Sequence, residues 1–156
     1  MPKPSINGLV LRDMEAADLP QVLAIETASY FTPWPQASFL DAMASPQQRC
    51  QVLTQGEEVL AYMVVAHIID EADLLNIAVA PQWRQQGLAR FLIATHQQQL
   101  KQQSMARFFL EVNVENHAAK HLYEQLGFQL VGRRKGYYPS ATGPQDALVM
   151  CYEIQP

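Results

Sequence analysis

The sequence has little of what several classes of protein require. Its two cysteines, Cys50 and Cys151, give neither a disulfide framework nor the spacing of a metal site. Its longest apolar-rich run, Val59 to Ile69, is too short to span a bilayer and contains His67. The formal net charge of −4 argues against duplex nucleic acid as the main ligand, because that ligand favours a basic face. We therefore expect no bound metal, no membrane contact and no direct need for nucleic acid.

The N-terminus is expected to carry no secretory signal. Residues 1–5, Met-Pro-Lys-Pro-Ser, have no apolar core of the kind that a secretory signal requires. The hydrophobic content of 49% and the charged content of 17% are typical of a globular protein, and 156 residues can bury a proper core. We expect one domain over residues 1–156, a cytoplasmic location and, from the negative charge, compatibility with a cationic substrate such as an amine.

Hydrophobic periodicity predicts helices and strands along the whole chain. Gly127 is expected to end the last helix as a left-handed cap, with Phe128 making the hydrophobic contact beyond it. The order of these elements predicts an α/β (α+β) fold. Antiparallel hairpins surround a central β–α–β crossover, which gives a mixed, mostly antiparallel sheet with helices on both faces. Strands are expected at 8–12, 50–54, 59–69, 74–79, 108–114, 129–138 and 147–154. Helices are expected after Asp18, which can cap the first of them, over 36–43, from 87 to about 103, and after Asn116, which caps the last. The inner stripe of that last helix is expected to be Ala118, Ala119, Leu122, Tyr123 and Leu126.

The most informative segment runs from Val79 to Arg90. An apolar strand ends at Val79, a tight turn containing Gly87 follows, and an apolar helix opens at Leu88. The free backbone N–H groups of such a turn and of a helix N-terminus favour an anion, and Gly87 lets a ligand approach closely. A nucleotide is a poorer match, because the Gly-Lys-Ser/Thr ending and the three spaced glycines of nucleotide motifs are missing.

Arg84, Gly87 and Ala89 follow the pattern Arg-x-x-Gly-x-Ala, which resembles the pyrophosphate loop of the Gcn5-related N-acetyltransferases (the GNAT superfamily). The similarity covers almost the whole chain and is greatest to bacterial ribosomal-protein alanine N-acetyltransferases. It implies the acyl-CoA N-acyltransferase fold, and transfer of acetyl from acetyl-CoA to the α-amine of the N-terminal alanine of a small-subunit ribosomal protein. The other segments that carry the resemblance are Pro33-Trp34, Leu75 to Val79, Leu110-Glu111-Val112, Asn116 to Phe128, Tyr137-Tyr138-Pro139 and Asp146-Ala147.

The resemblance also implies roles for individual residues. Glu111 would be the general base, Tyr123 the general acid, and the N–H of Val79 the donor to the developing oxyanion. Trp34, Tyr137 and Tyr138 would bind the substrate peptide. Backbone groups would pair with the pantetheine arm of acetyl-CoA at Ile77, Ala78 and Val79, with Asn116 holding the arm from a facing helix. The pyrophosphate would lie against Arg84, Gln85, Gln86, Gly87, Leu88, Ala89 and Arg90.

The residues by themselves leave other interpretations open. Glu111 lies opposite the apolar face of its strand and could be a solvated carboxylate. Tyr123 lies on the inner stripe of its helix and could be a core residue, and Asn116 is fully explained as a helix cap.

Three further features bear on the site. The basic run Arg133-Arg134-Lys135 is expected to be solvated, or to meet a CoA phosphate or ribosomal RNA. His117 and His121 have a zinc-like spacing on one helix face, but without a third ligand they are expected to be exposed. Asn113 departs from the family pattern, which has arginine at this position, and this concerns the substrate rather than the cofactor.

Two other functions fit the same fold. The acceptor could be a small-molecule amine or a protein lysine, or the protein could be a non-catalytic acyl-CoA sensor. The presence of both Glu111 and Tyr123 favours an enzyme, and aromatic side chains near Trp34 and Tyr137 favour a narrow slot for a peptide N-terminus.

Overall fold

The structure, a computed structural model, describes residues 8–155, so the expectation that residues 1–5 carry no secretory signal lies outside the described residues. Each expected helix and strand is present in the expected order, and two short 3₁₀ helices, η2 and η3, are additional. The elements are β1 (Leu9–Asp13), η2 (Ala16–Asp18), α1 (Leu19–Ser29), α2 (Gln36–Ala44), β2 (Gln48–Gln55), β3 (Glu58–Ile68), β4 (Glu71–Val79), η3 (Pro81–Trp83), α3 (Leu88–Gln102), β5 (Arg107–Asn113), α4 (His117–Gln125), β6 (Gln129–Tyr138) and β7 (Gln145–Glu153).

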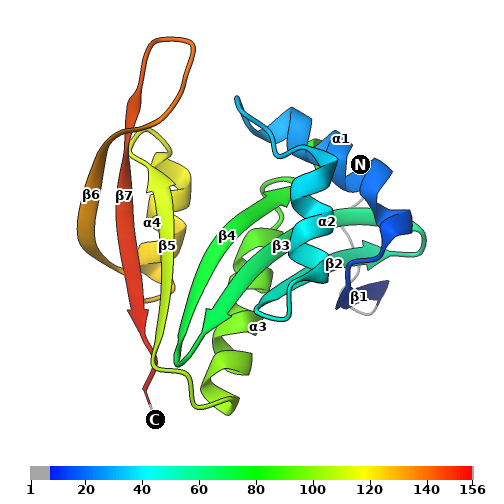
Figure 1. The fold of residues 1–156 in the computed structure, drawn as a ribbon, viewed down its shortest axis with the longest axis horizontal. Helices are drawn as coiled ribbons and strands as arrows, with labels where there is room; N and C mark the ends of the chain where they lie inside the picture. The colour runs from blue at the N-terminus through cyan, green and yellow to red at the C-terminus, as the bar shows by residue number, and fades with distance from the viewer. Residues whose placement is uncertain (1–7, 156) are drawn as a thin grey trace. The chain divides into compact units, whose positions relative to one another are not determined.

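The hydrogen-bonded strand order is β1-β2-β3-β4-β5-β7-β6 (Figure 1), which confirms a mixed and mostly antiparallel sheet. The chain divides into two compact units, and β4 and α3 contribute residues to both. Unit 1 contains the described residues up to Ala66 together with Leu75–Leu92. Unit 2 contains His67–Leu74 together with the described residues from Ile93 onward.

Unit 1 is built on the antiparallel strands β1, β2 and β3, with α1 and α2 packed beside them (Figure 1). Tyr62 on β3 is fully buried and lies opposite Val52 of β2. Its ring meets the ring of Phe39 on α2 edge-on at 5.8 Å, and its hydroxyl donates to Glu26 on α1 at 2.6 Å. One aromatic side chain therefore joins both helices to the sheet.

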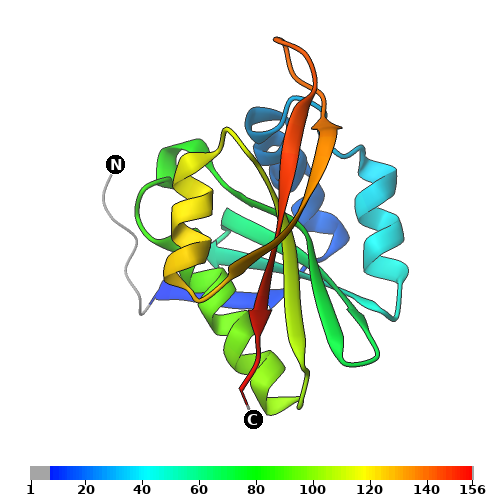
Figure 2. The same cartoon turned by 90° about the vertical axis from the view of Figure 1, so that its left-hand side faces the viewer.

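Unit 2 is built on β5, β7 and β6, and β7 lies between the other two and pairs antiparallel with both. The first residues of β4 pair in parallel with β5, where Asp73 lies opposite Phe109. The alternating residues Phe108, Leu110 and Val112 are buried, as their pattern predicts. In Figures 1 and 2 the loop between β6 and β7 extends past the end of β5.

A histidine pair anchors the part of α3 that belongs to unit 2. Nε2 of the buried His96 lies 3.1 Å from Nε2 of His67, and its ring lies 5.4 Å from that of Phe108. Neither α3 nor another helix in the described part of the chain is long and apolar enough to cross a bilayer.

Both ends of α4 follow the sequence signals. The Asn116 side chain accepts from the backbone N–H of Ala119 at 3.2 Å, which is the expected N-cap. At the other end Gly127 has φ +97°, and the N–H of Phe128 returns to the carbonyl of Tyr123 at 3.0 Å. The predicted inner stripe is narrower than expected, because Ala118 in the first turn of this nine-residue helix is exposed.

The predicted capping role of Asp18 is wrong. Asp18 directly precedes α1, but its side chain does not cap that helix. Instead both carboxylate oxygens accept from Arg12 at 2.8 Å, and Oδ2 also accepts from the N–H of Glu15. The bidentate, charge-assisted hydrogen bonds with Arg12 are stronger than the single hydrogen bond of a helix cap, so the carboxylate turns to Arg12.

Replacing Asp18 with Asn is expected to lower the free energy of unfolding by about 1–2 kcal/mol at pH 7, because the amide cannot accept both guanidinium bonds. The bonds from Arg12 lower the pKa of Asp18 below its unfolded value of roughly 3.9. The stabilisation is therefore complete above about pH 4 and is lost as the pH falls through the lower folded pKa. Urea unfolding of both proteins across pH 2–7 measures this. A gap that stays constant at low pH would contradict it.

Candidate active site

The end of β4 presents backbone groups along one edge within unit 1. The N–H of Ala80 donates to the carbonyl of Leu60 on β3 at 2.8 Å. Since backbone groups alternate along a strand, those of Ala78 also face β3, whereas those of Ile77 and Val79 face the opposite way. The strand edge predicted to meet pantetheine therefore offers the N–H groups of Ile77 and Val79.

Side chains from two other segments bind the carbonyls of this edge. The Tyr30 hydroxyl, at the end of α1, donates to the carbonyl of Ile77. Nε of Arg84 donates to the carbonyl of Val79 at 3.0 Å, and Nη2 of the same guanidinium donates to Oγ of Ser29 at 3.0 Å. The first residue of the predicted pyrophosphate loop thus ties the loop to β4 and to α1.

The loop that follows η3 has the conformation expected of an anion site. Gln85 has φ +62° and Gly87 has φ +81°, and a Cβ added at Gly87 would meet no atom of the described residues within 4 Å. Within the protein itself, glycine is therefore required by its backbone angle, while the space beside it is open. The N–H groups of Leu88 and Ala89 lie in the first turn of α3, where the helix itself supplies no acceptor. The loop and the helix N-terminus can therefore offer backbone donors to an anion.

A buried carboxylate holds the segment that contains Trp34. Glu26 on α1 is 1% exposed and accepts three hydrogen bonds, from the backbone N–H of Trp34 at 2.9 Å, from Nδ2 of Asn76 at 2.9 Å and from the hydroxyl of Tyr62. The ring of Trp34 lies 5.2 Å from that of Phe39. Glu26 therefore joins the predicted peptide-binding segment to β4 one residue before Ile77. The sequence signal for it was its place on the buried stripe of α1, four residues after Val22.

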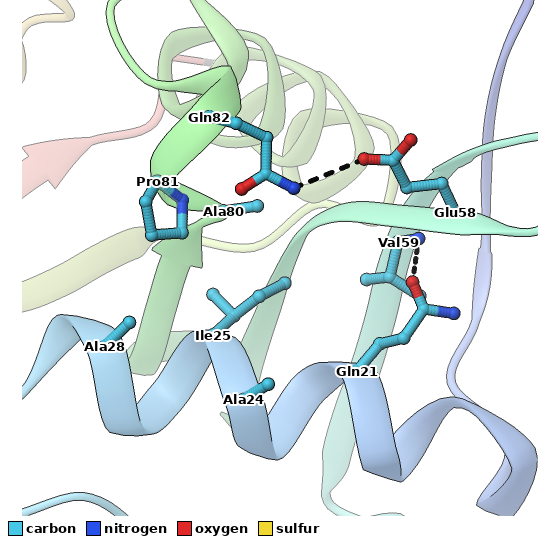
Figure 3. A pocket seen from close by; sticks show the side chains of 9 residues that line it. All are labelled: Gln21, Ala24, Ile25, Ala28, Glu58, Val59, Ala80, Pro81 and Gln82. Atoms are coloured by element: carbon cyan, nitrogen blue, oxygen red, sulfur yellow. Dashed lines mark hydrogen bonds between the residues drawn. The ribbon is translucent and has the colours of Figure 1, made fainter.

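A hollow of about 240 Å³ in unit 1 lies beside η3 and α1 (Figure 3). Its polar rim is already bonded within the protein: Gln21 accepts from the N–H of Val59 at 2.8 Å, and Gln82 donates to Glu58 at 3.4 Å. The other lining side chains of α1, Ala24, Ile25 and Ala28, are small or apolar. The hydrogen bonds of the rim join α1 and η3 to β3, and we assign no chemistry to this hollow.

The predicted base, Glu111, lies on β5 in unit 2 and is not a solvated carboxylate. Its side chain is 21% exposed, and Oε1 lies 2.9 Å from Nε of Arg134 on β6. Arg133 pairs at 2.6 Å with Asp146. All three residues of the basic run are exposed, as expected, and the head groups of both arginines also have a carboxylate partner.

Three tyrosines accompany Glu111 in unit 2. The rings of Tyr137 and Tyr138 meet edge-on at 5.1 Å. Burial raises the pKa of Tyr138, and the charge of Glu111 raises it further. Tyr123 on α4 is 6% exposed, and burial alone raises its pKa to about 12, so its hydroxyl keeps its proton at neutral pH. A carboxylate that accepts a proton and a phenol that holds one are the two groups that acyl transfer to an amine requires.

The remaining predicted residues of unit 2 have structural partners. Asn113 donates to Gln145 at 2.7 Å and accepts from the N–H of Glu115 at 2.9 Å, so it fixes the end of β5. His117 and His121 are exposed, as expected. Among the described residues, no group of three or more His, Cys, Asp or Glu side chains is arranged to hold a metal ion.

The predicted site residues therefore form two groups. Unit 1 brings together Trp34, the end of β4 and the loop from Arg84 to Arg90, and unit 2 brings together Glu111 and the tyrosines. Reasoning from the sequence missed Glu26 and the partner of Glu111, Arg134.

Comparisons with known proteins show the family to which this chain belongs. A family model described as "Acetyltransferase (GNAT) family" matches residues 19–128. The [ribosomal protein bS18]-alanine N-acetyltransferase of Escherichia coli K12 is 35% identical over 144 residues, which cover 92% of this chain and 97% of that protein. The enzyme of the same name from Salmonella typhimurium is 33% identical over 141 residues, 90% of this chain and 95% of that protein.

Solved structures show the same fold. The crystal structure of the ribosomal-protein-S18-alanine N-acetyltransferase from E. coli has a TM-score of 0.89 at 34% identity, covering 95% of each chain. A spermidine N-acetyltransferase from Vibrio cholerae, in complex with CoA and spermine, has a TM-score of 0.82 at 22% identity, covering 95% of this chain and 96% of that one, and shares the fold alone. The match over residues 19–128 and the identity over nearly the full length place this chain in the acetyltransferase (GNAT) family, as an acetyltransferase enzyme.

Proposed function

We propose that this enzyme transfers the acetyl group of acetyl-CoA to the α-amine of the N-terminal alanine of a small-subunit ribosomal protein. The observation that carries the proposal is the 35% identity, over 92% of this chain, to an enzyme named for that reaction on ribosomal protein bS18. The proposal is supported by the presence of Glu111 and Tyr123, which supply the two proton-transfer groups that the reaction requires.

The chemistry of the acceptor also favours an α-amine. An amine attacks a thioester only in its neutral form. An α-amine with a pKa near ~8 costs about 1 kcal/mol to deprotonate at pH 7, whereas a lysine near ~10.4 costs about 4–5 kcal/mol. A carboxylate acting directly or through water is sufficient for the first case.

In the proposed mechanism the amine nitrogen attacks the thioester carbonyl carbon while Glu111 takes a proton from the nitrogen. The N–H of Val79 donates to the oxygen as it gains negative charge. The C–S bond then breaks, and Tyr123 gives its proton to the thiolate. No acyl-enzyme is required, and both cysteines are buried.

The cofactor roles are those that the family resemblance implies. Backbone N–H groups of the Gln85–Arg90 loop and the first turn of α3 would hold the pyrophosphate, and the edge of β4 at Ile77 to Val79 would pair with pantetheine. Asn116 would add a bond to the pantetheine arm beyond its role as a cap. Trp34, Tyr137 and Tyr138 would line the peptide slot.

A panel of three acceptors tests the function directly. One is a peptide that begins with alanine and contains a lysine, the second is the same peptide with its α-amine acetylated, and the third is spermidine. We expect CoA release only with the free α-amine, because the blocked peptide presents only lysine. Mass spectrometry of the product locates the acetyl group.

The same panel decides between the rival functions. Faster turnover of spermidine, or acetylation of lysine in the blocked peptide, would replace the proposal with a small-amine or lysine acetyltransferase. No CoA release with any acceptor, despite binding of acetyl-CoA, would indicate a non-catalytic sensor.

A further inference from the structure

Arg134 on β6 forms an ion pair with Glu111, the carboxylate that we propose as the base. Its Nε lies 2.9 Å from Oε1 of Glu111 on β5, although β7 lies between these two strands. The register explains the reach, because Ala147 of β7 lies opposite both Arg134 and Asn113, the residue two positions after Glu111. The Arg134 side chain is 57% exposed and that of Glu111 only 21%. An exposed cation therefore covers a largely buried anion.

Tyr137 completes the cluster. The guanidinium carbon of Arg134 lies 5.2 Å from the centroid of the Tyr137 ring, within the range of a cation–π contact. The charge of Glu111, partial burial and a hydrogen bond to Glu111 raise the pKa of Tyr137, whereas the charge of Arg134 lowers it. The pKa of Tyr137 therefore depends on the charges of both Glu111 and Arg134.

A pinned bulge in β6 sets the direction of Arg134. The register between β6 and β7 shifts between Arg134 and Tyr138, and Gly136 has φ +61° within this shift. Asp146 of β7 accepts from Nε of Arg133 at 2.6 Å and from the N–H of Gly136 at 2.9 Å. Since neighbouring residues of a strand face opposite ways, fixing Arg133 on Asp146 directs Arg134 to the face that carries Glu111.

A second carboxylate lies on the same face. Asp73 of β4 lies opposite Phe109, two residues before Glu111. Burial and the charge of Glu111 raise the pKa of Asp73, and the charge of Arg134 lowers it. The face that carries the ion pair therefore has a second carboxylate, toward which a displaced guanidinium can move.

We propose that Arg134 is a positioning residue that stands in for the α-ammonium of the substrate: it holds Glu111 in the free enzyme, and the incoming ammonium displaces it toward Asp73. The proposal rests on the proposed function, since it assumes a cationic acceptor. Before it attacks, the acceptor must compete with Arg134 for Glu111 and then release one proton of its ammonium to solvent, which leaves the neutral amine. Arg134 therefore sets the KM for the amine and leaves the KM for acetyl-CoA unchanged.

The kinetic test uses the alanine-starting peptide. Arg134→Met is expected to lower the KM for the peptide about two- to five-fold, the effect of removing one partly exposed ion pair. It should leave kcat nearly unchanged, because Arg134 has already left Glu111 when the peptide is bound. Asp73→Asn is expected to raise the KM for the peptide, because Arg134 then stays on Glu111. In the double variant the effect of Asp73→Asn disappears.

Matched variants separate this role from charge and from folding. Lys135→Met removes the neighbouring positive charge and should leave both KM values unchanged. Arg134→Lys keeps the charge and should keep the peptide KM near its original value. A peptide KM that is unchanged or raised in Arg134→Met, with the KM for acetyl-CoA unchanged, would overturn the proposal.

A titration of the free protein tests the cluster without turnover. Ultraviolet absorbance follows tyrosine ionisation, and Tyr137→Phe identifies the phase that belongs to Tyr137. Arg134→Met should raise the pKa of Tyr137 and Glu111→Gln should lower it; no shift in either variant would show that the cluster does not exist in solution. Failure of the wild-type enzyme to acetylate the peptide would instead refute the proposed function, which makes the two failures distinguishable.

Discussion

Replacing Glu111 with Gln is expected to lower kcat for the alanine-starting peptide by about 10²–10⁴-fold and to change the affinity for acetyl-CoA by less than two-fold. The amide cannot take a proton from the attacking nitrogen, but it has nearly the shape of the carboxylate. The backbone loop proposed to hold the pyrophosphate belongs to unit 1 and is not altered. Steady-state kinetics gives kcat, and calorimetric titration gives the dissociation constant of acetyl-CoA.

The matched control is Glu153→Gln. Glu153 is also a carboxylate on a strand of unit 2 that pairs with an arginine, in this case Arg107 at 3.2 Å, but it is 59% exposed and has no proposed role. It should retain full activity. If Glu111→Gln turned over like the wild type, the role of base would have to be assigned to another group; if both variants lost activity equally, the loss would reflect the fold.

Much of the fold could be predicted because its signals are local. The cap at Asn116, the left-handed residue at Gly127 and the alternation along β5 each depend on a few neighbouring residues, and all three are present. Asp18 misled the sequence analysis because its partner, Arg12, lies in a different element. A helix-cap signal cannot reveal a competing bidentate ion pair six residues away.

The candidate site was harder to predict because its partners are distant in sequence. Glu111 and Arg134 are brought together by the insertion of β7 between β5 and β6, an order in which the last strand of the chain is not at the edge. No local pattern specifies that order. Glu26 is a different case, because a charge on the buried stripe of a helix signals a hydrogen-bonded carboxylate before any partner is known.

Replacing Tyr123 with Phe is expected to lower kcat about 10²-fold and to leave the affinity for acetyl-CoA nearly unchanged, because only the proton donor is lost. Tyr152→Phe is the matched control: the ring of Phe128 lies 5.8 Å from that of Tyr123 and 5.7 Å from that of Tyr152, so both tyrosines pack in one aromatic cluster. The control should keep its activity. Equal losses in the two variants, or weaker binding of acetyl-CoA in Tyr123→Phe, would indicate a packing role.

The high pKa of Tyr123 sets a condition on this role. With a pKa of about 12, Tyr123 would lose about 5 kcal/mol in protonating a solvated thiolate whose thiol has a pKa near ~8.5. Burial raises the pKa of a thiol as well: at Cys50 of this protein burial, with the charge of Asp13, raises it to about 11. A leaving thiolate that is equally buried would therefore have a thiol pKa close to that of Tyr123.

Because the phenol stays protonated well above neutral pH, ionisation of Tyr123 should not lower kcat between pH 7 and 10. Any decline of kcat in this range should therefore be the same in the wild type and in Tyr123→Phe. A decline that is present only in the wild type would mean that Tyr123 ionises in that range and is not the buried donor proposed.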